Sequence, residues 1–280
     1  MGRLAGKRAV IIGAASQDNM AQVTARRFAR EGATVMVAGR NQAPLDALAA
    51  EIGGHAALCD ITDKASVFAL ADAAKAKMGG VDIAMNASGW GLLKPLLDVT
   101  EEELNGIVAL QFTGVHHFLQ AFVAAMLENE PSGGSIIQLS SATTRAVIGN
   151  HAAYIGTKAG SEALIRCVAN DYGAAGIRAN IVSPAFTESP MTRASFATPG
   201  VVDAFLPRYP LGRLNTAEDV ANACLWLASD EAFVTGENIQ PNGGLTLRGN
   251  PQAADMAAAV GAAMAKLEGA KPEGAKSQEQ

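Results

Sequence analysis

Short apolar runs alternate with longer, partly polar segments along most of the chain. The short runs are rich in Val, Ile and Ala. Nearly continuous apolar runs of this length are typical of strands in a parallel sheet, because helices cover both faces of such a sheet. The predicted strands are residues 8–12, 34–38, 56–58, 82–85, 135–139, 178–182 and 238–240.

The segments between these runs repeat apolar residues at helical spacing. Helices are predicted at residues 21–31, 43–52, 64–78, 101–127 and 152–172, and another begins after Thr216, where Asp219 completes a pattern close to a capping box. Strands that alternate with helices of this length are joined by right-handed crossovers. The predicted fold class is therefore α/β, a doubly wound parallel sheet of the Rossmann type with about seven strands and helices on both faces.

Two later segments break this alternation. Residues 184–210 are irregular and contain Phe196, Phe205 and Tyr209, which we expect to be exposed on a functional lid. Beyond residue 248 the sequence becomes an Ala- and Met-rich helical segment, 251–267, followed by a tail of Gly, Lys, Glu and Gln. We predict a single Rossmann-type domain over residues 1–248 and an Ala-rich extension over 249–280 whose end is disordered.

Composition and charge exclude several classes of partner. The 280 residues are 49% hydrophobic and carry a net charge of −5, which argues against nucleic acid because phosphate binding needs a basic stripe. No continuous run of about 18 apolar residues occurs, so no membrane span is expected. Residues 1–13 lack the layout of a signal peptide, which indicates a cytoplasmic protein. The three cysteines and four histidines show no ligand spacing, so no metal site is predicted.

The first strand ends at Gly13, and the next helix begins near Met20. In this fold a pyrophosphate would sit at that helix N-terminus, held by backbone N–H groups. The usual glycine-rich fingerprint is absent, since the next glycine is Gly32. Ser16 and Asn19 still offer side-chain hydrogen bonds, so the turn is compatible with a nucleotide but does not establish one.

The ends of the second, third and fourth strands supply further candidates for cofactor binding. Gly39 and Arg40 replace the acidic residue that would bind a ribose 2′-hydroxyl, and a guanidinium suits a 2′-phosphate. This favours NADP over NAD, although a surface arginine would give the same pattern. Asp60 and Ile61 follow the third strand, where Asp60 could accept a hydrogen bond from an adenine amino group. Asn86 opens a small, polar loop that could pass beneath a cofactor.

Candidate chemistry lies at the end of the fifth strand and on the helix after it. Ser141 ends the strand, and Tyr154 and Lys158 follow four residues apart, on one face of a helix. A lysine ammonium beside a phenol favours the phenolate and should lower the Tyr154 pKa. Such a tyrosine can donate a proton to a carbonyl oxygen or remove one from an alcohol.

The order of these motifs resembles that of the short-chain dehydrogenase/reductase family, of the single-domain Tyr-x-x-x-Lys type, over about residues 4–247. The matching pieces are NASG at 86–89, SS at 140–141, YIGTK at 154–158, NIVSP at 180–184, PLGR at 210–213, EDV at 218–220 and NGG at 242–244. The resemblance implies that Tyr154 is the general acid/base, that Lys158 binds the nicotinamide ribose and that Ser141 polarises the substrate oxygen. It also implies that the backbone around Pro184 and Thr187 faces the nicotinamide carboxamide.

Two features depart from that family pattern. Gln111 stands where the family usually has an Asn that supports a water in a proton relay, so the geometry of the relay is in question. The glycine turn resembles that of enoyl-acyl-carrier reductases, in which the tyrosine lies seven residues before the lysine. Position 151 is His here, and the four-residue spacing of Tyr154 and Lys158 favours carbonyl chemistry.

The expected function is hydride transfer between NADP(H) and a ketone or secondary alcohol. Enoyl-thioester reduction and a non-catalytic dinucleotide sensor are the alternatives. An apolar small-molecule substrate is expected. Its pocket could be lined by Trp90, Leu92, Leu93, Ile148, Met191, Phe196 and Phe205, with His151 reaching in, although a packing role is the alternative for each of them. The resemblance further implies a homotetramer built on the helices at 101–127 and 152–172.

Overall fold

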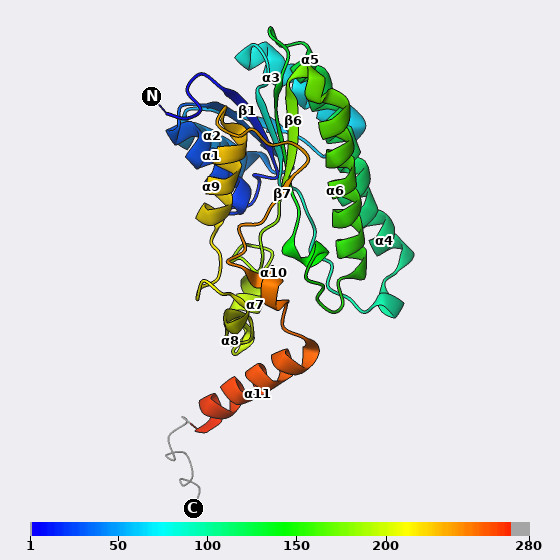
Figure 1. The fold of residues 1–280 in the computed structure, drawn as a ribbon, viewed down its shortest axis with the longest axis vertical. Coiled ribbons are helices and arrows are strands. Elements are labelled where there is room, and N and C mark those ends of the chain that lie inside the picture. Colours follow the sequence, from blue (N-terminus) through cyan, green and yellow to red (C-terminus); the bar gives the residue numbers. More distant parts are fainter. Residues whose placement is uncertain (1, 270–280) are drawn as a thin grey trace, which may run out of the picture.

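A seven-stranded parallel sheet forms the centre of the protein (Figure 1). The structure is a computed structural model that describes residues 2–269. The strand order is β3-β2-β1-β4-β5-β6-β7, so the chain reverses its direction of winding between β1 and β4. The strands are β1 (Arg8–Ile12), β2 (Thr34–Gly39), β3 (His55–Leu58), β4 (Ile83–Asn86), β5 (Gly134–Leu139), β6 (Ile177–Val182) and β7 (Asn238–Ile239). The predicted α/β, doubly wound fold is confirmed.

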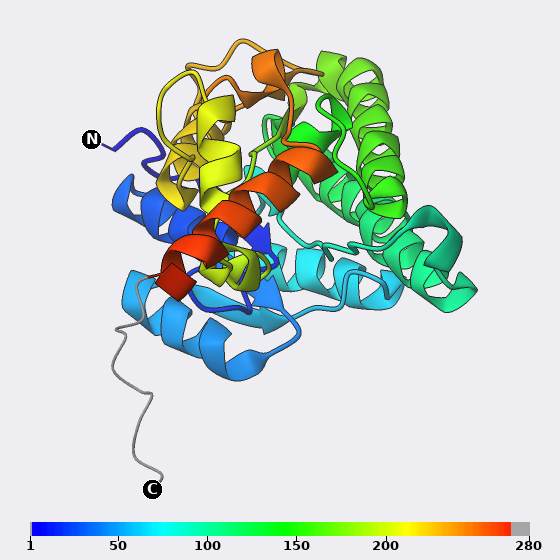
Figure 2. The ribbon, with the colours of Figure 1, turned by 90° about the horizontal axis from the view of Figure 1, so that it is seen from below.

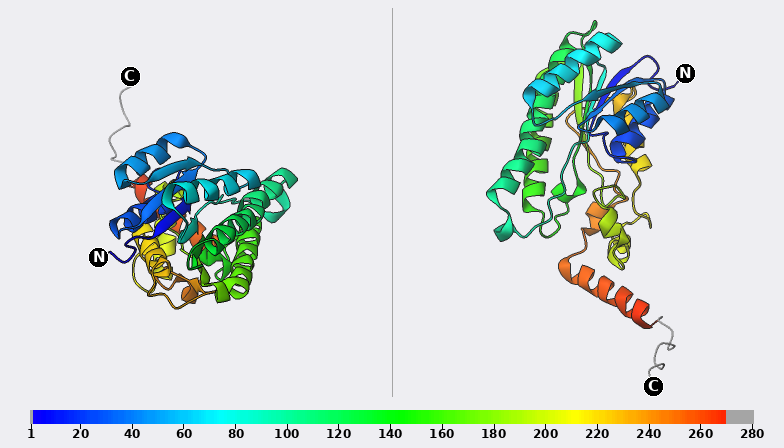
Figure 3. Two further views of the ribbon diagram at one scale, coloured as in Figure 1. Left: turned by 90° about the horizontal axis from the view of Figure 1, so that it is seen from above. Right: turned by 180° about the vertical axis from the view of Figure 1, so that it is seen from behind.

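Helices cover both faces of the sheet because alternate strand residues point to opposite sides. Val10 and Ile12 belong to one buried cluster and Ala9 and Ile11 to the other. On one face lie α1 (Met20–Arg30), α2 (Gln42–Ile52) and α9 (Ala217–Ala228). On the other lie α3 (Lys64–Met78), α5 (Gly114–Leu127) and α6 (Ala152–Tyr172), with α4 (Glu101–Val108) reaching beyond the sheet; the view from behind shows these layers (Figure 3).

The single helix predicted over residues 101–127 is interrupted. Between α4 and α5, residues Ala109–Thr113 form a π-helical turn, which contains Gln111. By length and composition alone Glu101–Leu127 could cross a membrane, because an 18-residue stretch within it has a mean hydropathy of 1.3. Half of that stretch is buried in this fold.

The segment after β6 is more ordered than predicted. It contains α7 (Arg193–Ala197) and α8 (Val201–Phe205). The expectation of exposed aromatics is wrong for Phe205 and Tyr209, which are 5% and 1% exposed. Phe186 lies between Phe196 and Phe205, with ring centroids 4.4 and 4.3 Å away, and this stack draws the segment into a small apolar cluster.

The C-terminal part forms α10 (Leu245–Arg248) and α11 (Ala253–Gly269). Seen from below, α11 crosses the face that carries α7 and α8 (Figure 2). Met256 and Val260 of α11 pack against the apolar cluster of α8. The disordered end predicted for the extension falls on residues 270–280, outside the described residues.

Candidate active site

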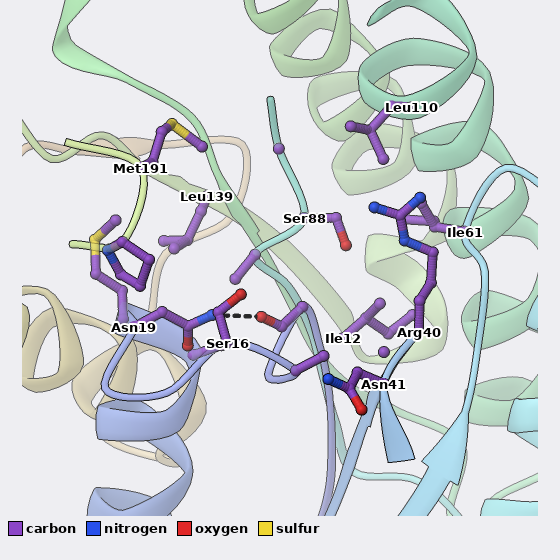
Figure 4. A pocket seen from close by; sticks show the side chains of 18 of the residues that line it. Ile12, Ser16, Asn19, Arg40, Asn41, Ile61, Ser88, Leu110, Leu139 and Met191 are labelled. Carbon is purple, nitrogen blue, oxygen red and sulfur yellow. Dashed lines mark hydrogen bonds between the residues drawn. The ribbon is translucent and has the colours of Figure 1, made fainter. Parts of the chain in front are cut away.

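A cleft of about 630 Å³ opens at the carboxyl ends of β1, β2 and β4, where the winding of the sheet reverses (Figure 4). Its size is typical of a small-molecule or cofactor site. Loop residues 87–89 and residues 189–191 line its other side. The predicted cofactor residues in its lining are Gly13, Ser16, Asn19, Met20, Arg40, Asp60 and Ile61.

The turn after β1 depends on Gly13 and Asn19. Gly13 has φ 98°, and a Cβ there would lie 2.8 Å from the carbonyl carbon of Ala87, so this position requires glycine. Asn19 Nδ2 donates to the Gly13 carbonyl oxygen at 2.7 Å, and Asn19 Oδ1 accepts from the Gln22 N–H at 3.0 Å. The Asn19 side chain therefore caps α1 and closes the turn. It lines the cleft as predicted, but its amide already has partners within the chain.

The end of β2 presents a cation to the cleft. Gly39 lies against the turn, since a Cβ there would approach the Ala15 Cβ to 2.7 Å. Arg40 follows it, and its exposed side chain extends along the cleft (Figure 4). Asp60 Oδ1 accepts from the Thr62 N–H at 2.9 Å, and this bond is the main cause of a lowered Asp60 pKa. The carboxylate thus faces Arg40 in its charged form.

Asn86 is fully buried beneath the cleft and does not line it. Its Nδ2 donates to Gln138 Oε1 at 3.0 Å, and its Oδ1 accepts from the Ser88 N–H at 3.0 Å. The side chain therefore joins β4 to β5 and shapes the loop that borders the cleft.

Ser141, Tyr154 and Lys158 come together beside this cleft, as the sequence predicts. Tyr154 and Lys158 occupy consecutive turns of α6, and the Lys158 Nζ lies 5.9 Å from the centre of the Tyr154 ring. The Ser141 hydroxyl accepts from the Thr143 hydroxyl at 2.8 Å and lies close enough to Tyr154 to act on the pKa of its phenol. Lys158 is 4% exposed and donates to the Leu139 carbonyl oxygen at 2.9 Å. A hydroxyl, a phenol and an ammonium therefore meet at one edge of the sheet.

The electrostatics of this group differ from the prediction. Burial raises the Tyr154 pKa, and the effect of the nearby Ser141 hydroxyl only partly opposes it. Burial also lowers the Lys158 pKa to about 8, while the charge of Glu162 acts to raise it. The predicted net lowering of the Tyr154 pKa is wrong for this structure, because the loss of water around the phenol dominates.

Gln111 lies in the π-helical turn and is 1% exposed. Its Nε2 donates to Thr157 Oγ1 at 2.9 Å, and its Oε1 accepts from the Trp90 N–H at 2.9 Å. A Cβ on Gly89 would lie 3.2 Å from Gln111 Oε1 and 3.6 Å from Lys158 Nζ. The amide therefore joins the loop after β4 to the helix that carries Tyr154 and Lys158.

The predicted residues after β6 lie beside the cleft rather than in its lining. The Pro184 carbonyl oxygen accepts from the Ala142 N–H at 2.9 Å. Thr187 is 3% exposed; its Oγ1 donates to the Ala185 carbonyl oxygen at 2.9 Å and accepts from Asn215 Nδ2. Both residues hold the base of the segment whose tip, residues 189–191, lines the cleft.

The expected apolar contacts are only partly available near this site. Met191 is 54% and Trp90 39% exposed, whereas Phe205 belongs to the buried cluster around α8. A Cβ on Gly91 would lie 2.8 Å from the Met191 Sδ, so Met191 bridges the cleft from one rim to the other. The His151 ring stands edge-on to Tyr154 at a centroid distance of 5.7 Å.

Sequence reasoning missed the polar residue Glu162 and the cleft-lining Ser189 and Pro190. Glu162 follows Lys158 by four residues, so helical spacing alone could have placed it on the same face. Nothing in the sequence marked residues 189–190, because their position depends on how the segment after β6 folds back across the cleft.

Comparisons with known proteins agree with this fold and these motifs. The family described as enoyl-(acyl carrier protein) reductase matches residues 13–246. A D-threitol dehydrogenase from Mycolicibacterium smegmatis is 31% identical over 252 residues, which cover 88% of this chain and 95% of that protein. An L-xylulose reductase from Bos taurus is 32% identical, with 86% and 97% of the two chains covered.

A crystal structure of a gluconate 5-dehydrogenase from Burkholderia cenocepacia, in complex with NADP and tartrate, has the same fold. Its TM-score against this protein is 0.83 at 27% identity, and the match covers 88% of this chain and 97% of the other. The match to the family ends at residue 246, so α11 lies beyond it.

Proposed function

Since this chain belongs to the short-chain dehydrogenase/reductase family and is an oxidoreductase, we propose that it transfers a hydride between NADP(H) and a ketone or secondary alcohol. The observation that carries the proposal is the grouping of Ser141, Tyr154 and Lys158 beside a cleft at the reversal point of the sheet. The catalytic domain would comprise residues 1–248, and residues 249–280 would be an extension.

The cleft fits a dinucleotide in both shape and chemistry. The N–H groups of Met20 and Ala21 begin α1 with no acidic residue in its first turn, which suits a pyrophosphate. Ser16 and Ser88 add hydroxyl donors, and Ile61 gives an apolar contact for a base. We assign these positions, with Gly13, to the cofactor.

In the proposed mechanism Tyr154 donates a proton to the carbonyl oxygen during reduction and removes it from the alcohol during oxidation. A nicotinamide bound in the cleft would supply or accept the hydride. Ser141 holds the same substrate oxygen through its hydroxyl group. The Lys158 ammonium stabilises the phenolate that Tyr154 becomes when it gives up its proton, and it would also bind the nicotinamide ribose.

Gln111 contributes by hydrogen bonding both to the loop after β4 and to α6, which fixes the position of that loop relative to the helix. On the far side, Pro184 and Thr187 would support the nicotinamide end of the cofactor, since they anchor the segment that closes the cleft. Asn86 lies beneath the cleft, and its hydrogen bond from the Ser88 N–H fixes the loop that would pass under the cofactor.

The preference for NADP rests on Arg40. Its guanidinium has no carboxylate within salt-bridge distance in the described residues, so it is available to a 2′-phosphate. Arg40→Ala should raise the KM for NADP about tenfold or more and leave the KM for NAD unchanged. A clear preference of the unaltered protein for NAD would contradict this assignment.

Enoyl-thioester reduction is the second candidate, and the description of the matching family favours it. Against it stand the four-residue spacing of Tyr154 and Lys158 and the His at position 151. The relatives reported above are named as dehydrogenases and a reductase of polyols and sugars, which supports carbonyl–alcohol chemistry here.

The test is a panel of ketones, secondary alcohols and an enoyl thioester, followed by nicotinamide absorbance with NADP and with NAD. Tyr154→Phe should lower kcat for the best carbonyl substrate by about 10²–10⁴-fold. Tyr172→Phe is the matched control, because Tyr172 ends the same helix away from the cleft. Unchanged turnover in Tyr154→Phe would remove the acid/base role, and turnover of the enoyl thioester alone would support the second candidate.

We further propose a cytoplasmic homotetramer built on the outer faces of α4, α5 and α6. Exposed apolar side chains on these helices, Leu104 at 45% and Leu127 at 44%, support an interface there. Light scattering coupled to gel filtration should give four times the mass of one chain.

A further inference from the structure

A buried carboxylate lies directly behind the proposed catalytic group. Glu162 is 7% exposed and follows Lys158 by one turn of α6. Its Oε1 accepts from the Ser140 hydroxyl at 2.5 Å and from the Thr144 hydroxyl at 2.9 Å. Burying a carboxylate is costly unless hydrogen bonds and a nearby positive charge compensate for the lost water.

The hydroxyl groups that bind Glu162 lie on both sides of Ser141. Ser140 precedes it, and Thr144 ends the short helical turn that Ser141 caps. The Thr144 hydroxyl also lies 2.9 Å from the Ser141 carbonyl oxygen. Movement of Ser141 relative to α6 would therefore break at least one of these bonds, and Tyr154 and Lys158 stand on α6.

The positive charge that compensates Glu162 is Lys158. Within the described part of the chain the two side chains form no direct salt bridge, and the ammonium instead donates to the Leu139 carbonyl oxygen. Burial lowers the Lys158 pKa, and Glu162 is the ionisable group whose negative charge opposes this effect. Tyr154 is the other titratable group that faces Lys158. With a neutral residue at position 162, only dipoles such as the Leu139 carbonyl group would stabilise the Lys158 ammonium.

We infer that Glu162 is a positioning residue of this site, which fixes the Ser141 turn against α6 and keeps the Lys158 ammonium charged. The inference rests on the proposed function for its catalytic consequence, because a neutral Lys158 would no longer stabilise a Tyr154 phenolate. It goes beyond that function by assigning the carboxylate two separable tasks, one through hydrogen bonds and one through charge.

Two substitutions separate these tasks. Glu162→Gln keeps an acceptor for the Ser140 and Thr144 hydroxyls and removes the charge, whereas Glu162→Ala removes both. An opposite charge a few ångströms away typically moves a pKa by one unit or more. Burial lowers the Lys158 pKa to about 8, so Glu162→Gln should move the alkaline fall in kcat to lower pH by about one unit.

Glu162→Ala should show the same shift and a further fall of about tenfold in kcat at neutral pH, because the Ser141 turn loses its anchor. Glu162→Asp should restore part of the charge effect. Asp171→Asn is the control, since Asp171 is an exposed carboxylate on the same helix, and it should leave kcat and its pH profile unchanged. A purely structural role for Glu162 would lower thermal stability without moving the pH profile.

A measurement that needs no substrate separates this inference from the proposed function. The Lys158 side chain can be titrated by NMR on protein labelled at lysine, with its signal assigned by its loss in Lys158→Arg. Glu162→Gln should lower the Lys158 midpoint by about one pH unit. An unchanged midpoint overturns the inference, whatever the activity panel shows. Full turnover in Tyr154→Phe would overturn the proposed function and leave the titration result standing.

Discussion

Gln111→Ala removes a side chain that joins two parts of the site and should be among the more destabilising single changes. Gln111 is 1% exposed, and its amide makes one hydrogen bond to Thr157 and one to the Trp90 N–H, both at 2.9 Å. Alanine breaks both bonds and leaves a cavity. Asparagine is one methylene shorter, so it can reach one partner from this backbone position but not both.

The expected cost follows from these two contacts. Each hydrogen bond contributes about 1 kcal/mol net, and the cavity and the unpaired Trp90 N–H add about 1 kcal/mol more. Gln111→Ala should therefore lower the free energy of unfolding by about 3 kcal/mol. That loss corresponds to a fall on the order of 10 °C in Tm for a domain of this size. Gln111→Asn should cost about half as much.

Urea unfolding followed by far-ultraviolet circular dichroism gives the free energy directly. Gln42→Ala is the control, because Gln42 is exposed and makes a single side-chain bond, to Asp46 at 2.6 Å. It should change stability by less than about 0.5 kcal/mol. If Gln111→Ala also lies within about 0.5 kcal/mol of the parent, the two bonds do not stabilise the fold and the reasoning fails.

Three further predictions concern the cofactor turn, a helix cap and the C-terminal helix. Gly13→Ala should lower stability by at least about 1 kcal/mol and weaken NADP binding measured by calorimetry, because φ is 98° and the new Cβ would lie 2.8 Å from Ala87. The Asp219 pKa is lowered to about 2, chiefly by the hydrogen bond from Arg213, so the stabilisation is present above about pH 4 and is lost as pH falls towards 2. Because Arg213 is 60% exposed, the stabilisation by this ion pair amounts to about 1 kcal/mol. The urea midpoints of Asp219→Asn and of the parent protein should therefore converge at acid pH. A gap between the two midpoints that stays constant with pH would contradict this role of Asp219. Val260→Asp puts a charge where α11 meets α8, and limited proteolysis should then release α11 while the circular dichroism of the rest is retained; equal protease resistance would contradict that contact.

The sequence predicts the sheet and the helix beginnings well because these depend on local residues. Each apolar run became a strand within about two residues, since a short run rich in β-branched residues favours a strand that is buried on both sides of a parallel sheet. Asp63 caps α3 by accepting from the Ala65 N–H, and the capping box of Thr216 and Asp219 is formed in full. These signals span a few residues and need no tertiary contact.

Features that depend on distant contacts were harder to predict. The π-helical turn at Ala109–Thr113 has no marker in the sequence, and it interrupts what reads as one amphipathic helix. Phe205 and Tyr209 follow an irregular segment and so look exposed, yet Phe186 and Leu245 bury them from elsewhere in the chain. The sequence alone suggests that Asn19 offers hydrogen bonds to a ligand, because its hydrogen bonds with Gly13 and Gln22 form only when the turn folds.

Gln111 lies in the π-helical turn, at the position where the resembled family usually has Asn. The turn inserts one residue into the helix and so changes the direction in which the side chain at position 111 points. The extra methylene then lets one amide span from the Trp90 N–H to Thr157 Oγ1, on the helix of Tyr154 and Lys158. Displacement of the loop after β4 would therefore shift the part of α6 that carries Lys158. Binding in the cleft and proton transfer at Tyr154 should thus be coupled through Gln111.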